Sequence, residues 1–240
     1  MTLEETINYR RSVRHYKNAP IDANKVKYCL ELATLAPNSS NMQLWEFYHI
    51  VNPEMLKKIA EACLGQQSAT TAQQMVVFVT RQDLHRKREK EMLALESKNV
   101  LKNSPQPKQE KRLKSWKMYY GRIMPFLYTK FLGVFGIIRK IIANLIGIFR
   151  PIVYQVSEND MRVVVHKTCA LAAQTFMLAM ANEKYDTCPM EGFDSKKMKN
   201  ILKLPNGAEI NMVVSCGIRE EQGVWGERMR VPFDEVYFKI

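Results

Sequence analysis

Two short apolar runs have the pattern of strands that lie inside a sheet. Residues 75–80 read Met-Val-Val-Phe-Val-Thr, and residues 210–217 are similarly rich in β-branched side chains. A continuous apolar run of this length predicts a strand that is covered on both faces. The segment 46–51 is a third strand candidate with more polar positions.

The helical pattern is strongest in Val163–Asn182, which is rich in alanine and methionine and contains neither proline nor glycine. It predicts a long buried helix. Shorter helices are expected where a capping residue or a proline precedes apolar positions at helical spacing. Their expected ranges are 3–8, 22–36, 53–64 and 195–204, and residues 231–240 are expected to form an extended tail. This mixture of helices and strands predicts an α+β fold with a modest sheet flanked by helices.

The composition indicates a globular protein whose cysteines are reduced. Hydrophobic residues make up 46% of the 240-residue chain, enough for a sizeable core. The five cysteines form no CxxC pair, and the N-terminus shows no secretory signal. We therefore expect a cytoplasmic protein with buried, unreactive thiols and no metal site.

The formal charge of +12 is concentrated in the middle of the chain. Residues 81–167 contain 19 lysine and arginine residues against 7 aspartate and glutamate residues, and the remainder is balanced. A protein that binds nucleic acid over its whole surface would spread this charge more evenly. We therefore expect no nucleic-acid partner.

The segment Arg10–Arg14 carries the first candidate chemistry. Three arginines and Ser12 lie within five residues. Guanidinium groups match phosphate oxygens in geometry and can hold them bidentately. Three further segments are rich in polar or cationic side chains at loop positions: Ala36–Trp45, Pro189–Asp194 and Gly226–Pro232.

In this order, the four segments resemble the motifs of the nitroreductase family of FMN flavoproteins. Those motifs are RRSxR, APSSxNxQPW, PxEGFD and a C-terminal basic pair, and this chain differs from them at Asn38 and Leu44. The resemblance covers residues 1–80 and 163–240. It implies a nitroreductase-like FMN-binding core made of residues 1–84 and 160–240. It also implies a mostly antiparallel sheet and an intertwined homodimer.

The resemblance further implies two FMN sites at the dimer interface, each built from both chains. Arginines of the first and last motifs would hold the phosphate, ribityl chain or polar ring edge, and the loop at 37–41 would come from the partner subunit. Glu191 and Gly192 would lie near flavin N5, and Gln66 or Gln67 would add an amide contact. The implied cofactor-binding residues are Arg10, Arg11, Ser12, Arg14, Pro37, Asn38, Ser39, Asn41, Gln67, Pro189, Met190, Glu191, Gly192, Arg228 and Arg230.

A family member of this kind is an NAD(P)H:acceptor oxidoreductase. The resemblance implies ping-pong transfer of hydride from NADH or NADPH, through flavin N5, to a nitroaromatic, quinone or similar small acceptor. No side-chain nucleophile is expected. Two alternatives stay open: a specialised flavin reaction such as reductive dehalogenation or flavin destruction, and a membrane-surface or nucleic-acid binding module on a flavoprotein scaffold.

Residues 85–159 form a basic, partly hydrophobic helical insertion that is longer than the family's usual connection. Within it, residues 126–150 are long enough to span a bilayer, but Arg139 and Lys140 lie at the middle. Small and polar residues share one side of the expected helix and large apolar residues the other, which indicates an amphipathic helix. Three hypotheses follow: a lid over the flavin, peripheral contact with an anionic membrane, or packing on the dimer.

Overall fold

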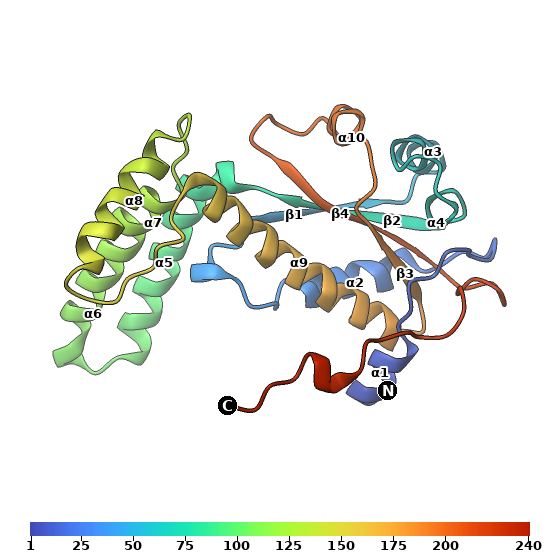
Figure 1. Ribbon diagram of the computed structural model, residues 1–240, viewed down its shortest axis with the longest axis horizontal. Helices are drawn as coiled ribbons and strands as arrows, with labels where there is room; N and C mark the ends of the chain where they lie inside the picture. The colour runs from blue at the N-terminus through green and yellow to red at the C-terminus, as the bar shows by residue number, and fades with distance from the viewer.

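A four-stranded antiparallel sheet forms the centre of the protein, whose computed structural model describes residues 1–240 (Figure 1). The strands are β1 (Trp45–Ile50), β2 (Gln74–Thr80), β3 (Asp186–Met190) and β4 (Glu209–Gly217), in the order β1-β2-β4-β3. The expected α+β class, the antiparallel sheet and three of its strands are confirmed.

The alternation of side chains along β2 explains its continuous apolar sequence. Val76 and Phe78 point into one hydrophobic core, and Met75, Val77 and Val79 point into another on the opposite face. The first core is covered by α2 (Ala23–Ala33) and α9 (Glu158–Asn182). The second core is covered by α3 (Pro53–Ala62), α4 (Gln67–Thr70) and α10 (Ser195–Ile201) (Figure 1).

Strand β3 is missing from the elements that the sequence predicts. Its five residues, Asp-Thr-Cys-Pro-Met, include a proline and lack an apolar alternation. Proline is tolerated because β3 pairs only with β4 in the sheet, as an edge strand. A local pattern could not show this, because the strand depends on a partner more than twenty residues away.

Helix α9 contains the predicted buried helix and begins five residues earlier. Ser157 and Asp160 form a capping box at its N-terminus. By length and composition it is the one helix that could cross a membrane. Here, however, it packs against the sheet, with side chains such as Phe176 and Met180 fully buried, so it is a core helix.

The insertion forms a separate helical layer at one end of the sheet (Figure 1). Its helices are α5 (His85–Asn103), α6 (Gln106–Met118), α7 (Met124–Tyr128) and α8 (Val134–Gly147), with a π-helical turn over Tyr119–Ile123. Met42 and Leu44 reach from the core into the apolar cluster between these helices.

The prediction of one amphipathic helix over residues 126–150 is wrong, because the chain breaks between α7 and α8. Leu132 and Gly133 adopt left-handed backbone angles, with φ of 47° and 82°. Such residues cannot continue a right-handed helix.

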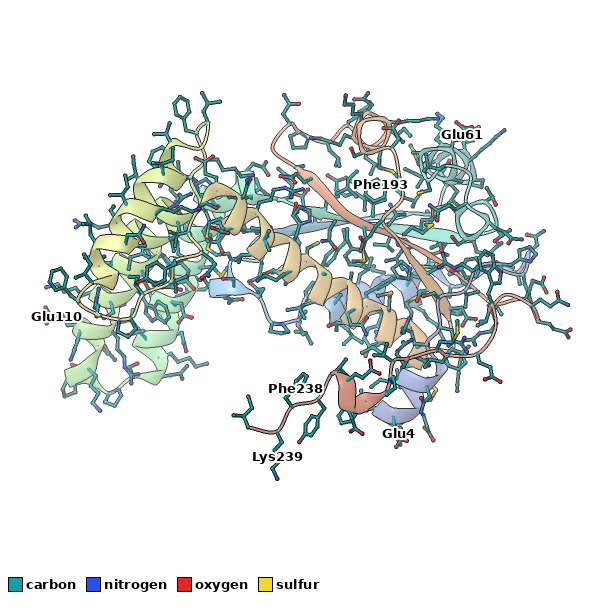
Figure 2. The ribbon with its side chains drawn as sticks, viewed as in Figure 1. Glu4, Glu61, Glu110, Phe193, Phe238 and Lys239 are labelled. Carbon is teal, nitrogen blue, oxygen red and sulfur yellow. The ribbon has the colours of Figure 1, made fainter.

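Both chain ends lie at the bottom of the view in Figure 1. Helix α1 (Leu3–Tyr9) is capped by Thr2 and packs against α9. The tail expected to be extended forms no strand and carries a short 3-10 turn over Phe233–Glu235. Figure 2 shows Phe238 and Lys239 projecting from it away from the body of the protein.

All five cysteines are free and buried, which confirms the expected buried thiols. Burial raises the pKa of Cys29 and of Cys169 to about 12. Since the thiolate is the reactive form, these groups are inert near neutral pH.

Candidate functional site

The segment from Arg10 to Arg14 runs beside the edge strand β3. Ser12 forms an isolated parallel bridge with Thr187, and the Val13 N–H donates to the Thr187 carbonyl at 3.1 Å. Val13 is fully buried, so the polar residues on either side of it stand at the surface. The sheet thus fixes the backbone that carries the arginines.

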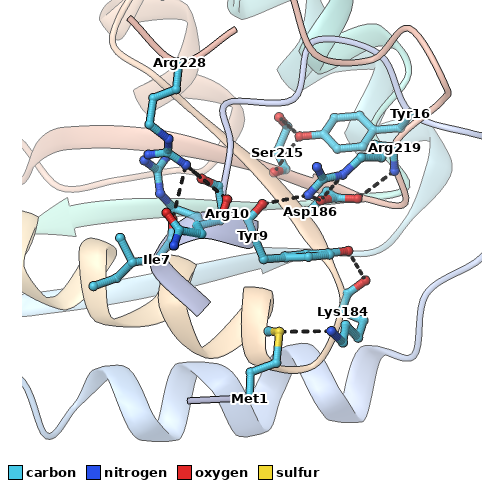
Figure 3. Close-up of polar contacts among 11 residues, drawn as sticks. Met1, Ile7, Tyr9, Arg10, Tyr16, Lys184, Asp186, Ser215, Arg219 and Arg228 are labelled. Carbon is cyan, nitrogen blue, oxygen red and sulfur yellow. Dashed lines mark hydrogen bonds and ion pairs between the residues drawn. The ribbon is translucent and has the colours of Figure 1, made fainter. Parts of the chain in front are cut away.

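The C-terminal segment returns to this place and joins Arg228 to the end of α1. The Arg228 Nη2 donates to the Arg10 carbonyl at 2.8 Å and to the carbonyls of Ile7 and Asn8 at 3.2 Å (Figure 3). These carbonyls lie at the C-terminal end of the helix, where a cation is favoured. The structure therefore brings together two motifs that are more than two hundred residues apart.

A cavity of about 300 Å³ opens between these two segments. Arg11 donates to the Gly226 carbonyl at 2.8 Å, and the Arg14 guanidinium lies 5.6 Å from the centre of the Trp225 ring. The residues that line the cavity are Arg10, Arg11, Ser12, Arg14, Val224, Trp225, Glu227, Arg228, Met229 and Arg230.

The cavity carries positive charge that the protein itself does not neutralise. Its arginines form no ion pair with any carboxylate, although Glu227 is part of the lining. Burial and the nearby Arg228 and Arg230 lower the pKa of Arg10. A cluster of guanidinium groups that repel one another is a site for an anion.

A buried ion pair next to β3 holds the backbone from which the arginine segment starts. Asp186 of β3 pairs with Arg219, which follows β4, and also accepts from the Arg219 N–H at 2.8 Å (Figure 3). Arg219 in turn donates to the Tyr9 carbonyl at 2.9 Å and lies 4.4 Å from the centre of the Tyr9 ring. Burial would lower the pKa of Arg219, but Asp186 holds it above its ordinary value. The pair fixes the residue that precedes Arg10.

The loop after α2 forms a second group of predicted site residues. The Asn38 Oδ1 accepts from the Gln43 N–H at 2.9 Å, and its Nδ2 donates to Asn41 Oδ1 at 3.3 Å. Ser40, Asn41 and Gln43 have φ angles of 55°, 50° and 47°. Three such residues in four positions make a sharply folded loop whose shape needs outside support.

Two tyrosines of the insertion provide that support. The Tyr119 hydroxyl lies 2.7 Å from the Ser40 hydroxyl, and the Tyr120 hydroxyl donates to the Ser40 carbonyl at 2.9 Å. Trp116 packs against both tyrosine rings. The sequence interpretation missed these residues. The one sequence feature that could have indicated their role is that Trp116, Tyr119 and Tyr120 are clustered in an otherwise basic helical stretch.

The loop after β3 forms a third group. Gln66 Nε2 donates to the Gly192 carbonyl at 2.7 Å, and the Ser68 hydroxyl approaches the Met190 sulfur at 3.2 Å. The N–H groups of Glu191 and Gly192 donate to no other protein atom. Gln67 is exposed and its side chain forms no hydrogen bond, so within this chain Gln66 is the amide that reaches the loop.

Pro37, Asn38, Ser39 and Asn41 lie far from the arginine cavity within one chain. The Ser39 N–H contacts Thr168 in the first half of α9, whereas the Tyr9 hydroxyl donates to the Lys184 carbonyl just beyond its end. Sixteen residues at the rise of an α-helix separate these points by about 24 Å. The structure therefore places the first, third and fourth motifs around β3 and the second motif beside the first half of α9 (Figure 1).

A family sequence model and a named relative both connect this chain to the nitroreductases. The sequence model of the Nitroreductase family matches residues 7–218. MhqN of Bacillus subtilis, provisionally named an NAD(P)H nitroreductase, is 22% identical over 235 residues, which cover 95% of this chain and 94% of MhqN.

Solved structures show the same fold. YdfN of Bacillus subtilis superposes with a TM-score of 0.73 at 19% identity, covering 99% of this chain and 98% of YdfN. A protein from Exiguobacterium sibiricum in complex with FMN gives 0.68 at 19% identity, covering 100% of this chain and 98% of that one. Since the family's sequence model spans most of its length, the chain belongs to the nitroreductase family.

Proposed function

We propose that the protein is an FMN-dependent oxidoreductase that transfers hydride from NADH or NADPH to small acceptors such as nitroaromatics or quinones. The observation that carries this proposal is the arginine cavity, whose guanidinium groups lack carboxylate partners. Family membership and the FMN complex of the Exiguobacterium protein support FMN as the anion that this cavity binds.

The residues around the cavity fit this cofactor. Arg10, Arg14, Arg228 and Arg230 would hold its phosphate and the polar edge of its ring, because guanidinium groups suit both. The free N–H groups of Glu191 and Gly192 would serve as donors to the ring. When bound, FMN supplies a ring nitrogen that accepts and releases hydride, so no nucleophilic side chain is needed.

A homodimer would complete the site. Within one chain, the loop at 37–41 and Tyr9, which precedes the arginines, contact α9 at points about 24 Å apart, so the partner subunit's copy of the loop would have to supply it. The tail supports this arrangement, because Phe233 and Phe238 are 68% and 76% exposed in the single chain. Exposed phenylalanines gathered on one projecting segment are typical of a surface that another protein covers.

The same arrangement supports ping-pong kinetics, since nicotinamide and acceptor would use one open ring face in turn. The five reduced thiols support a cytoplasmic location.

The proposed dimer would be tested by sedimentation of the whole protein, with a variant that lacks tail residues 231–240 for comparison.

Flavin titration is the direct test of the function. We expect purified protein to bind FMN, to bleach it with NADH or NADPH, and to recover colour on addition of a quinone or nitroaromatic compound. Arg10→Gln combined with Arg14→Gln should lose FMN, whereas Arg122→Gln, an exposed arginine of the insertion, should keep it. A folded dimer that binds no FMN would refute the proposal.

A further inference from the structure

Helix α8 buries its small and polar side against the protein and exposes its apolar side to solvent. It packs on the protein through Gly136, Arg139 and Ala143, all of which are buried. The apolar side chains on its other side face solvent. Ile137, Ile138, Ile141, Ile142 and Leu145 are 62, 41, 55, 40 and 59% exposed, and Ile148 and Phe149 just after the helix are 73 and 87% exposed.

Arg139 fixes this orientation. Its Nε donates to the Val156 carbonyl at 2.6 Å, and its Nη1 donates to the carbonyls of Phe126 and Thr129 at 2.7 and 3.0 Å. Rotating α8 to bury its isoleucines would break these bonds and leave the end of α7 without a donor. The apolar face is therefore held outward and needs a partner from outside the chain.

Cations predominate around this face, although Asp160 at the start of α9 lies near Lys140. Residues 111–157 contain no aspartate or glutamate and nine lysine and arginine residues. Lys140 and Arg150 are exposed beside the apolar row and form no ion pair. Glu158, the first residue of α9, already accepts hydrogen bonds from the N–H groups of Phe131 and Gly133. An apolar row flanked by exposed cations that form no ion pair complements an anionic lipid surface.

We propose that α8 is a docking element for an anionic phospholipid bilayer, with its isoleucine row in the interface and Lys140 and Arg150 at the headgroups. The helix has fourteen residues and is about 21 Å long, too short to span a hydrocarbon core of about 30 Å. It also stands at the outer edge of the insertion, away from α1 and the arginine cavity (Figure 1).

A second copy of the chain fits this face less well. A two-fold contact centred on this face would place the patch against its own copy. Lys140 and Arg150 would then face their own copies, and residues 111–157 offer no carboxylate to pair with them. Bilayer phosphates supply the charge that a second copy lacks.

Vesicle sedimentation of the full-length protein tests the proposal. We expect binding to vesicles of phosphatidylcholine with phosphatidylserine, little binding to phosphatidylcholine alone, and release by added salt. Ile137→Gln with Ile141→Gln should weaken binding at least about tenfold, since each removes an apolar side chain from the interface. Leu95→Gln with Leu101→Gln is the matched control, because these leucines of α5 are 56% and 58% exposed.

The substitutions lie at exposed positions, and thermal melting would check that all variants stay folded. Failure of the wild-type protein to bind anionic vesicles would overturn the proposal. So would equal loss in the isoleucine and leucine variants. Self-association in the absence of lipid that is abolished by the isoleucine substitutions would overturn it as well, because the face would then be a protein interface.

Discussion

The Ser40 and Tyr119 hydroxyls lie 2.7 Å apart and connect the helical insertion to the sharply folded loop after α2. Tyr120 adds a second bond to the same residue, from its hydroxyl to the Ser40 carbonyl. Consecutive side chains can converge in this way because they lie in a π-helical turn, which changes the spacing of a helix locally. The insertion therefore shapes a loop that the proposed dimer would present to FMN.

Removing the Tyr119 hydroxyl should weaken FMN binding without unfolding the protein. Tyr119→Phe deletes one hydrogen bond worth about 1 kcal/mol, which corresponds to about a fivefold rise in the FMN dissociation constant. Tyr120→Phe should act similarly, and fluorescence titration would measure both. Tyr154→Phe is the control, because the side chain of this half-exposed tyrosine forms no hydrogen bond. An unchanged affinity in both variants would show that the loop keeps its shape alone.

The parts of the fold that could be predicted are those whose burial leaves a local signature. β2 and β4 read as continuous apolar runs because both faces are covered, and α9 lacks any breaker. β3 and the break before α8 left no such signature. β3 depends on pairing with β4, and the break depends on carbonyls that the distant Arg139 satisfies.

The candidate site was only partly predictable for a related reason. The proximity of Arg10 and Arg228 came from a family resemblance, and the structure brings these residues together. The contacts of Tyr119 and Tyr120 lie in the insertion, outside the motifs of the resemblance. Their role depends on packing between the insertion and the core, which no spacing within the sequence encodes.

Breaking the buried ion pair behind the arginine segment should destabilise the protein. Asp186→Asn leaves the Arg219 guanidinium without its charge partner, and we expect a loss of about 2–3 kcal/mol, below the full value for buried pairs because Arg219 is 29% exposed. Urea unfolding would measure this loss. Glu61→Gln breaks the exposed pair with Lys197 and should cost about 0–1 kcal/mol. Equal losses in the two variants would contradict a supporting role for Asp186.

Acid should loosen the segment that leads into α8. Burial would raise the pKa of Glu158, but the N–H groups of Phe131 and Gly133 outweigh it and hold the pKa below the ordinary 4.5. A depressed pKa means that Glu158 contributes stability above the ordinary value and loses it as the pH falls through the folded-state value.

Glu158→Gln should therefore reduce the free energy of unfolding at neutral pH and flatten its decline below pH 4.5. Urea unfolding across this pH range would measure both effects. Glu110→Gln should leave the pH profile unchanged, because that exposed carboxylate has no partner. A profile of Glu158→Gln that follows the wild type would show that the contacts with Phe131 and Gly133 are not formed in solution.

The close approach of α8 to the start of α9 should make Gly136 intolerant of any side chain. A Cβ atom there would lie 2.8 Å from the Glu158 nitrogen and 3.3 Å from the Ser157 Cα, both backbone atoms that cannot move independently. We expect Gly136→Ala to cost about 1–3 kcal/mol through this clash, although alanine favours helices. At Gly121, a Cβ atom would meet nothing within 4 Å, so Gly121→Ala should be neutral or slightly stabilising. Urea unfolding of the two variants separates the clash from helix propensity. If Gly136→Ala were as stable as Gly121→Ala, α8 would have to sit farther from α9 in solution, and the contacts of Arg139 that hold its apolar face outward would be lost with it.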